Sequence, residues 1–167
     1  MNAIVAVDNQ WGIGKNNDLL FHLPADMKYF RQKTLGKIVA MGSNTLLSFP
    51  NSKPLKNRTN VVLFPGGEQR DDCIVLQSLE DMKAHLSQYP TEDVFVIGGA
   101  MFYATMLEYC DTVYVTKVNA CGQAQVFFPN LDQKTEWTLA ESAQPVLDGD
   151  KEIVFCVYKN SNPKPLL

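Results

Sequence analysis

The chain has 167 residues, of which 46% are apolar and 20% are charged. This composition excludes a disordered chain, and the length predicts one domain over residues 1–167. A net charge of −3 argues against a protein that binds nucleic acid or an anionic membrane, because phosphate binding depends on a basic face. No apolar run approaches the roughly 18 residues of a membrane span.

Short apolar runs alternate with helical patterns through the first two thirds of the chain. The runs are almost continuous in Val, Ile, Leu or Phe, which is typical of strands buried on both faces of a parallel sheet. We predict strands over Ile4–Val7, Ile38–Met41, Val61–Phe64, Ile74–Leu76 and Val94–Ile97. We predict helices over Pro24–Thr34, after Ser78 as far as Pro90, and over Ala100–Leu107, with Ser78 and Asp81 as a capping pair.

The pattern changes after Thr112 and becomes that of antiparallel strands. Thr112–Val118 is a β-branched strand, and Trp137–Ser142 and Ile153–Lys159 flank a turn at Asp148-Gly149. The predicted fold class is therefore α/β, with a mostly parallel central sheet, helices on both faces and a C-terminal antiparallel hairpin. Such sheets bind ligands at the carboxyl ends of their strands.

Two strand-to-helix turns have the residues that a phosphate group needs. One is Gly98-Gly99 before the Ala100 helix, and the other is Gly42-Ser43-Asn44-Thr45. Glycine lets a ligand approach the backbone, and the first N–H groups of a helix carry partial positive charge. Two such turns on one sheet edge suit a dinucleotide, although each alone is also explained as a tight turn, and the usual G-x-G-x-x-G pattern is absent.

Asp26 lies in the first turn of the Pro24 helix, on the same side as Leu23 and Phe30 and beside Met27. An acidic residue there can simply complement the helix dipole. Its apolar neighbours instead indicate a carboxylate that faces the core or a cleft, where it could hold a planar cationic nitrogen group through two charge-assisted bonds. The preceding segment, Asp8–Asn17, is rich in turn residues and is either a mobile lid or a surface loop.

The cysteines and histidines argue against a metal site. Two histidines are present and no Cys-x-x-Cys pair occurs, so we expect no metal ligand set. The first residues read as a strand and not as a secretion signal. We therefore expect a reduced, cytoplasmic protein. The four cysteines are Cys73, Cys110, Cys121 and Cys156.

Taken together and in order, these motifs resemble the bacterial dihydrofolate reductase family over nearly the whole chain. The residues that carry the resemblance are Ala6-Val7-Asp8, Trp11–Lys15, Leu23–Phe30, Met41-Gly42, Thr45, Ser48-Phe49-Pro50, Arg58–Leu63, Ile97–Ala100, Tyr103, Thr116 and Phe128-Pro129.

The resemblance implies that 7,8-dihydrofolate is reduced to tetrahydrofolate by hydride from NADPH, with NADH as a further candidate, for one-carbon and thymidylate synthesis. Asp26 would be the catalytic acid beside the pterin, oriented by Thr116, and Arg58 would bind the glutamate tail. The other implied substrate-binding residues are Ile4, Val5, Ala6, Phe21, Met27, Phe30, Phe49, Leu55 and Ile97. The implied cofactor-binding residues are Ala6, Ile13, Gly14, Gly42, Ser43, Asn44, Thr45, Leu63, Phe64, Gly98, Gly99, Met101, Phe102 and Tyr103.

Several positions depart from the family pattern. Leu20-Phe21 stands where the family usually has Pro-Trp, and Gln125 stands where an Asp commonly bonds the lid. The positions that usually carry the cations and hydroxyls for an adenosine phosphate hold Ser43, Asn44, Phe64 and Gln77, so we predict weak discrimination between NADPH and NADH, unless Arg70 or Lys56 supplies the charge.

Two other functions fit parts of the pattern. A same-fold reductase of a ribosylated pyrimidine in riboflavin synthesis shares the Gly98-Gly99 turn, but Asp26, Phe30 and Arg58 suit a pterin with a glutamyl tail. A non-catalytic pterin- or nucleotide-binding paralogue would bind ligand without turnover. We expect a monomer with small-molecule partners only, because no strand or helix carries a conspicuous apolar outer face.

Overall fold

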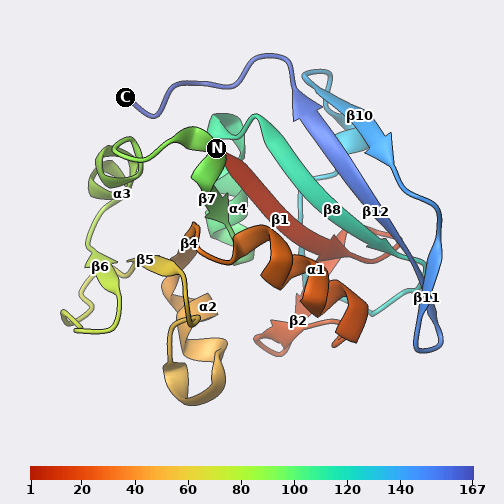
Figure 1. Cartoon of the computed structure of the whole chain (residues 1–167), viewed down its shortest axis with the longest axis horizontal. Helices are drawn as coiled ribbons and strands as arrows, with labels where there is room; N and C mark the ends of the chain where they lie inside the picture. Colours follow the sequence, from red (N-terminus) through yellow and green to blue (C-terminus); the bar gives the residue numbers. More distant parts are fainter.

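A computed structural model describes all residues 1–167 and has a nine-stranded central sheet (Figure 1). The strand order is β10-β12-β8-β1-β7-β4-β5-β6, and β11 pairs with β12. Neighbouring strands from β8 to β6 run parallel, whereas β12, β10 and β11 are antiparallel. The strands are β1 (Asn2–Val7), β4 (Ile38–Gly42), β5 (Thr59–Leu63), β6 (Ile74–Leu76), β7 (Val94–Val96), β8 (Thr112–Val118), β10 (Trp137–Ser142), β11 (Val146–Asp148) and β12 (Lys151–Asn160).

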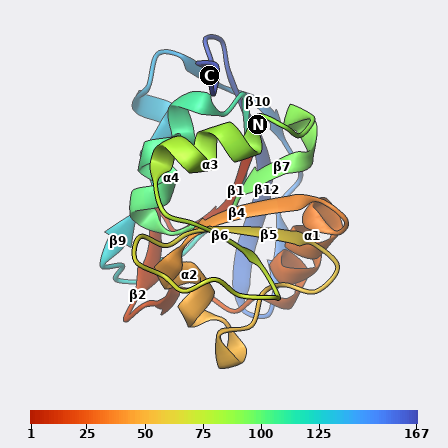
Figure 2. The same cartoon turned by 90° about the vertical axis from the view of Figure 1, so that its left-hand side faces the viewer.

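Helices cover both faces of this sheet, as predicted. Figure 2 shows α1 on one side of the strands and α3 and α4 on the other. Ser78 caps α3 by accepting a hydrogen bond from the Asp81 amide, at 3.1 Å, which confirms the predicted capping pair. The helices are α1 (Pro24–Thr34), α2 (Ser43–Ser48), α3 (Leu79–Leu86) and α4 (Ala100–Met106), and none is long and apolar enough to cross a membrane.

Four short strands were not predicted from the sequence. A separate three-stranded sheet, β3-β2-β9, forms from the predicted lid and a distant segment: β2 (Gly12–Lys15), β3 (Asp18–Leu19) and β9 (Val126–Phe127). The predicted C-terminal hairpin exists as β10 paired with β12, but the Asp148-Gly149 turn joins the additional strand β11 to β12. Each of the four is only two to four residues long, too short for its side-chain pattern to indicate a strand.

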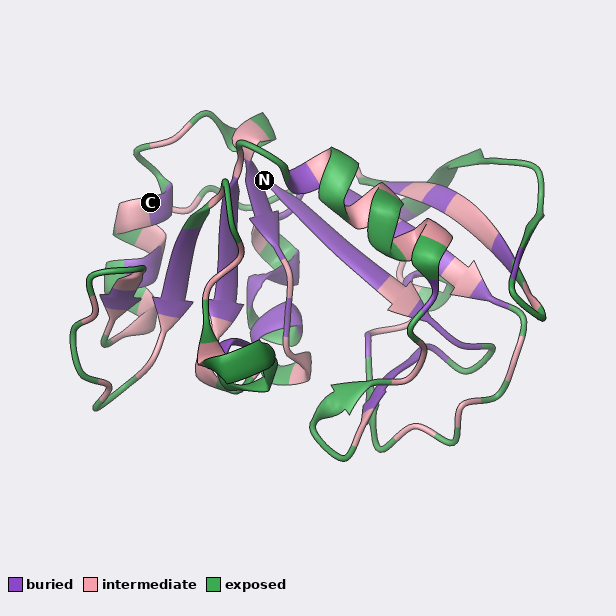
Figure 3. Ribbon diagram, turned by 60° about the horizontal axis from the view of Figure 1, so that its bottom comes forward, coloured by how far each residue is buried: buried purple, intermediate pink, exposed green.

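The side chains of β1 alternate between two apolar clusters, one on each face of the sheet. Ala3, Val5 and Val7 belong to the larger cluster, whereas Ile4 packs with the smaller one around Met41. The central strands are buried almost throughout, and α1 turns an exposed face outward (Figure 3). The carboxyl ends of β8, β1, β7 and β4 therefore lie side by side in a rigid frame.

Candidate active site

The two glycine-containing turns lie beside each other at the carboxyl edge of the sheet. β4 and β7 are parallel neighbours, and the Gly42 amide donates to the Gly98 carbonyl at 2.9 Å. Gly98 has φ of +141°, and a β-carbon added there would lie 2.9 Å from Thr45 Oγ1 and 3.8 Å from Tyr103 Cε2. Only glycine fits position 98, and it lets the two turns approach each other closely.

Asp26 lies in the first turn of α1 and points to β8. The Thr116 hydroxyl donates to Asp26 Oδ1 at 2.6 Å, the pairing that the resemblance implies. Burial raises the pKa of Asp26 above its ordinary value; the bond from Thr116 lowers it, and the nearby charge of Asp148 raises it again. This carboxyl therefore binds a proton more readily than a surface aspartate does.

Most of the predicted pterin wall is assembled next to α1. The side chain of Val5 packs on the opposite face of β1, so only the backbone of Val5 can border this wall. Phe21 packs with Leu23 and Val118 in a third cluster, and Met27 is 55% exposed. One apolar cluster on the face of β1 that carries Ile4 holds Ile4, Phe30, Phe49, Leu55 and Ile97, and Ala6 is half-buried on β1.

Arg58 is oriented by two hydrogen bonds at the far end of α1. Its Nε donates to the Lys56 carbonyl at 2.9 Å and its Nη1 donates to Thr34 Oγ1 at 3.1 Å, which leaves three of its five N–H groups. Burial and the charge of Arg31 lower the pKa of Arg58. Sequence reasoning missed Arg31, although its place five residues after Asp26 puts it on the same helix. Arg58 therefore keeps N–H donors that can bind an anion such as a carboxylate.

Tyr103 joins the glycine turns to β1. Its buried hydroxyl donates to the Ile4 carbonyl at 2.6 Å, and burial, with the charge of Asp26, raises the pKa of Tyr103. It therefore stays a neutral phenol. Phe102 beside it is buried, whereas Met101 is 86% exposed at the start of α4. The remaining predicted cofactor residues lie at strand ends: Ser43, Asn44, Leu63 and Phe64 follow or end β4 and β5, and Ile13 and Gly14 lie in β2.

The segment Asp8–Asn17, which the sequence predicts as a lid or a surface loop and which we call the lid below, is held by a buried carboxylate and by a distant loop. Asp8 is 4% exposed; its Oδ1 accepts from the amides of Gln10 and Gly12, both at 2.8 Å, and its Oδ2 accepts from the Gly122 amide at 3.0 Å. Gln125 Oε1 accepts from the Asn16 amide at 2.8 Å, so Gln at this position does bond the lid backbone.

We expect Asp8→Asn to loosen the lid. An amide has one acceptor oxygen, and its NH₂ group would face one of the three backbone N–H donors, so a buried donor loses its partner at a cost of about 1–3 kcal/mol. Urea unfolding should show this loss, and KM for the reduced nicotinamide should rise. Asp18→Asn is the matched control, because the Asp18 carboxylate is exposed in the same lid; equal behaviour of the two variants would contradict this role for Asp8.

Of the positions expected to contact the adenosine phosphate, Ser43, Asn44, Phe64 and Gln77 are not cations, and Lys56, one of the two candidate replacements, lies exposed in the turn before β5. The Gln77 side chain is occupied: its Oε1 accepts from the Gly66 amide at 2.7 Å and its Nε2 donates to the Gly67 carbonyl at 3.0 Å. Arg70, a candidate replacement, is paired with Asp72 at 2.9 Å and also donates to the Ser52 carbonyl.

A doubly covered sheet with paired glycine turns, beside a carboxyl on an apolar wall, defines an α/β protein built for a dinucleotide and a planar nitrogen heterocycle. Comparison with known proteins gives the family: residues 1–161 match the family model described as dihydrofolate reductase. The chain belongs to the dihydrofolate reductase family.

Individual relatives match most of the chain. The chain is 35% identical over 165 residues to the dihydrofolate reductase of Bacillus subtilis, covering 97% of this chain and 95% of the relative. It is 33% identical over 149 residues to that of Staphylococcus aureus, covering 89% of each. A solved structure of the Enterococcus faecalis enzyme, complexed with NADP(H) and RAB-propyl, superposes with a TM-score of 0.84 and 31% identity, covering 96% of both chains.

Proposed function

We infer that the protein reduces 7,8-dihydrofolate to 5,6,7,8-tetrahydrofolate with a reduced nicotinamide dinucleotide, NADPH in the first place. The observation that carries this is the Thr116–Asp26 bond of 2.6 Å beside the apolar wall and the paired glycine turns. One carboxyl, one wall for flat rings and one dinucleotide edge are the three parts that this reaction needs.

Asp26 acts on the substrate as a charge partner and a proton relay. Its carboxylate binds the 2-amino group and the N3 side of the pterin through two charge-assisted bonds. Its charge favours a proton on N5, which makes C6 a better hydride acceptor, and Asp26 helps to deliver this proton without itself reaching N5. Such assistance is typically worth about 10²–10⁴ in rate. Thr116 holds the carboxylate in the orientation that this requires.

The edge formed by the two turns fits the dinucleotide. The open backbone at Gly98, which a β-carbon would fill, gives its phosphates access to the amides of Gly98, Gly99 and Thr45. When bound, the reduced nicotinamide supplies the hydride. Tyr103, fixed by its bond to the Ile4 carbonyl, and Ala6 would border the nicotinamide ring, so much of the rate enhancement would come from positioning.

The test is a spectrophotometric assay that follows oxidation of the reduced nicotinamide with dihydrofolate as substrate. Turnover supports the reductase. Binding of both ligands without turnover would instead support a non-catalytic paralogue, and turnover only with a ribosylated pyrimidine would support the riboflavin-type reductase. The Arg31–Arg58 pair favours dihydrofolate among these substrates, because its glutamate tail carries carboxylates.

The same assay with both nicotinamides tests cofactor choice. Because Ser43, Asn44 and Phe64 offer no cation and Gln77 is engaged, a phosphate on the adenosine ribose loses a charge-assisted contact of about 1.5–3 kcal/mol, equivalent to roughly tenfold to a hundredfold in selectivity. We expect NADPH to be preferred only weakly over NADH. A ratio of kcat/KM above about a thousand would contradict this expectation.

A monomeric, cytoplasmic protein remains our proposal for its state in the cell. The four cysteines are unpaired, which suits a reducing compartment. Size-exclusion chromatography with light scattering tests the monomer directly.

A further inference from the structure

A buried carboxylate, that of Asp148, lies at the first turn of the helix that carries Asp26. Asp148 is 6% exposed, and its Oδ2 accepts from the Ala25 amide at 2.9 Å and from the Asp26 amide at 3.3 Å. α1 needs this partner because its own N-cap residue, Leu23, provides no side-chain cap. The first turn of the catalytic helix is therefore capped by a residue 122 positions away from Asp26.

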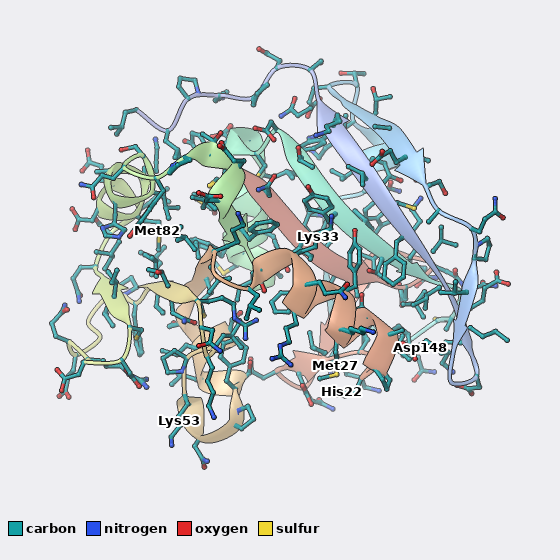
Figure 4. All side chains as sticks on the ribbon, in the orientation of Figure 1. His22, Met27, Lys33, Lys53, Met82 and Asp148 are labelled. Carbon is teal, nitrogen blue, oxygen red and sulfur yellow. The ribbon has the colours of Figure 1, made fainter.

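The fold holds Asp148 rigidly at this place. It is the last residue of β11, directly opposite Lys151 of β12, and the intervening turn contains Gly149 with φ of +65°. Figure 4 shows Asp148 between the β11–β12 hairpin and the end of α1 that carries Met27. Asp148 forms no ion pair, since the Lys151 ammonium is paired with Asp150 instead. Its negative charge is balanced by the N–H groups and the dipole of α1 alone.

Four elements carry the polar groups that interact electrostatically with Asp26. The Thr116 hydroxyl on β8 and the Asp148 carboxylate on β11 shift the pKa of Asp26. The Tyr103 phenol on α4 and the Tyr29 phenol on α1 are in turn affected by the charge of Asp26. Both phenols have raised pKa values and are neutral near pH 7. Asp148 is therefore the one charged group among them. A like charge nearby makes a carboxyl hold its proton more tightly.

We propose that Asp148 is a positioning residue for the reaction: its carboxylate fixes the first turn of α1, and its negative charge, bonded to the amide of Asp26 itself, acts on the Asp26 carboxyl. This proposal rests on the proposed function. In the productive complex, Asp26 and the bound pterin share a proton. The apparent pKa for loss of this proton belongs to the pair and not to either group alone. Asp148 extends the pH range of turnover toward alkaline pH, because its charge stabilises this proton.

Two variants separate the charge from the cap. Asn caps helices about as well as Asp but carries no charge, whereas Ala removes both. Asp150→Asn is the matched control, since it removes one charge from the same turn at a carboxylate that is 88% exposed. For each variant we would measure kcat against pH with saturating substrates, the ¹³C NMR titration of Asp26 in the free enzyme, the exchange rate of the Ala25 amide and the melting temperature.

In Asp148→Asn, we expect the alkaline limb of the kcat profile and the Asp26 titration to move to lower pH. On that limb kcat should fall about threefold to tenfold, as expected for loss of one neighbouring charge in a partly hydrated site, with kcat on the acid side within twofold of wild type. Asp148→Ala should show the same shift, together with faster exchange of the Ala25 amide and a melting temperature lower by about 2–4 °C. Asp150→Asn should leave all four measurements unchanged.

A pH profile and an Asp26 titration that coincide with wild type in both Asp148 variants would overturn the proposal, as would an equal shift in Asp150→Asn. The NMR titration also distinguishes this failure from failure of the proposed function. If wild type does not turn over dihydrofolate, the function is wrong, and the titration still decides whether Asp148 acts on Asp26.

Discussion

Replacing Asp26 by Asn is expected to lower kcat for dihydrofolate near neutral pH about 10²–10⁴-fold. The amide keeps the size of the carboxyl and still accepts the bond from Thr116, but it has no charge to favour a proton on the pterin and no proton to relay. Binding of the dinucleotide should remain, because its edge of the sheet is built from other residues. Stopped-flow measurement of hydride transfer at several pH values gives the rate directly.

The pH dependence distinguishes this role from simple damage. At acid pH, solvent increasingly protonates the pterin, so the deficit of the Asn variant should narrow as the pH falls. The wild-type rate should fall on the alkaline side as Asp26 and the pterin lose their shared proton. The Asn variant has no titrating group at position 26, so its pH profile should lack the part of this fall that comes from Asp26. A constant ratio of the two rates across the pH range would remove Asp26 from its assigned role.

Stability provides the control for folding. Because the pKa of Asp26 is raised in the folded protein, its contribution to stability is present at low pH and is lost as the pH rises through that pKa. The Asn variant does not pay this cost of ionising a buried group. We expect its melting temperature at pH 8 to equal or exceed that of wild type, so that lost activity cannot be attributed to unfolding.

Local signals were sufficient to predict the elements that present the site. The bounds of α1 and β8 are those predicted, since Pro24 and Gly36 mark the helix and a β-branched run marks the strand. The two glycine turns were predicted as ligand sites because the N–H groups at helix N-termini attract anions. The pairing of β4 with β7 brings these turns together. By contrast, the pairing of Thr116 with Asp26 came from the family resemblance, because a Thr in a strand carries no signal of its partner.

The parts that were missed depend on contacts between distant segments. The predicted lid contains β2, which pairs with β9. Asn16 of the lid bonds Gln125, which lies 109 residues further along the chain, so no local period in the sequence indicates this pairing. Asp148 looked like a turn residue before a glycine, and only the tertiary structure shows it at the start of α1. The side chain of Val5 also packs away from the predicted wall, because strand alternation turns it away from Ile4.

Replacing Arg58 by Lys is expected to raise KM for dihydrofolate about tenfold to a hundredfold, with a much smaller change in kcat. A lysine keeps the charge but loses the planar fork that Thr34 and the Lys56 carbonyl orient, and with it one charge-assisted bond of about 1.5–3 kcal/mol to the tail carboxylate. The three N–H groups of Arg58 that remain free are the donors that we propose for this carboxylate.

The substrate itself supplies the sharpest control. A dihydropterin without the glutamate tail should be reduced with the same kcat/KM by wild type and by the Arg58→Lys variant, because neither can use the missing carboxylate. Arg70→Lys, the same replacement at an arginine already paired with Asp72, should leave KM for dihydrofolate unchanged. The wild-type KM for dihydrofolate should rise with salt, as expected when an exposed ion pair is screened. If Arg58→Lys lowers kcat/KM equally for both substrates, the arginine supports the fold of the site and does not bind the tail.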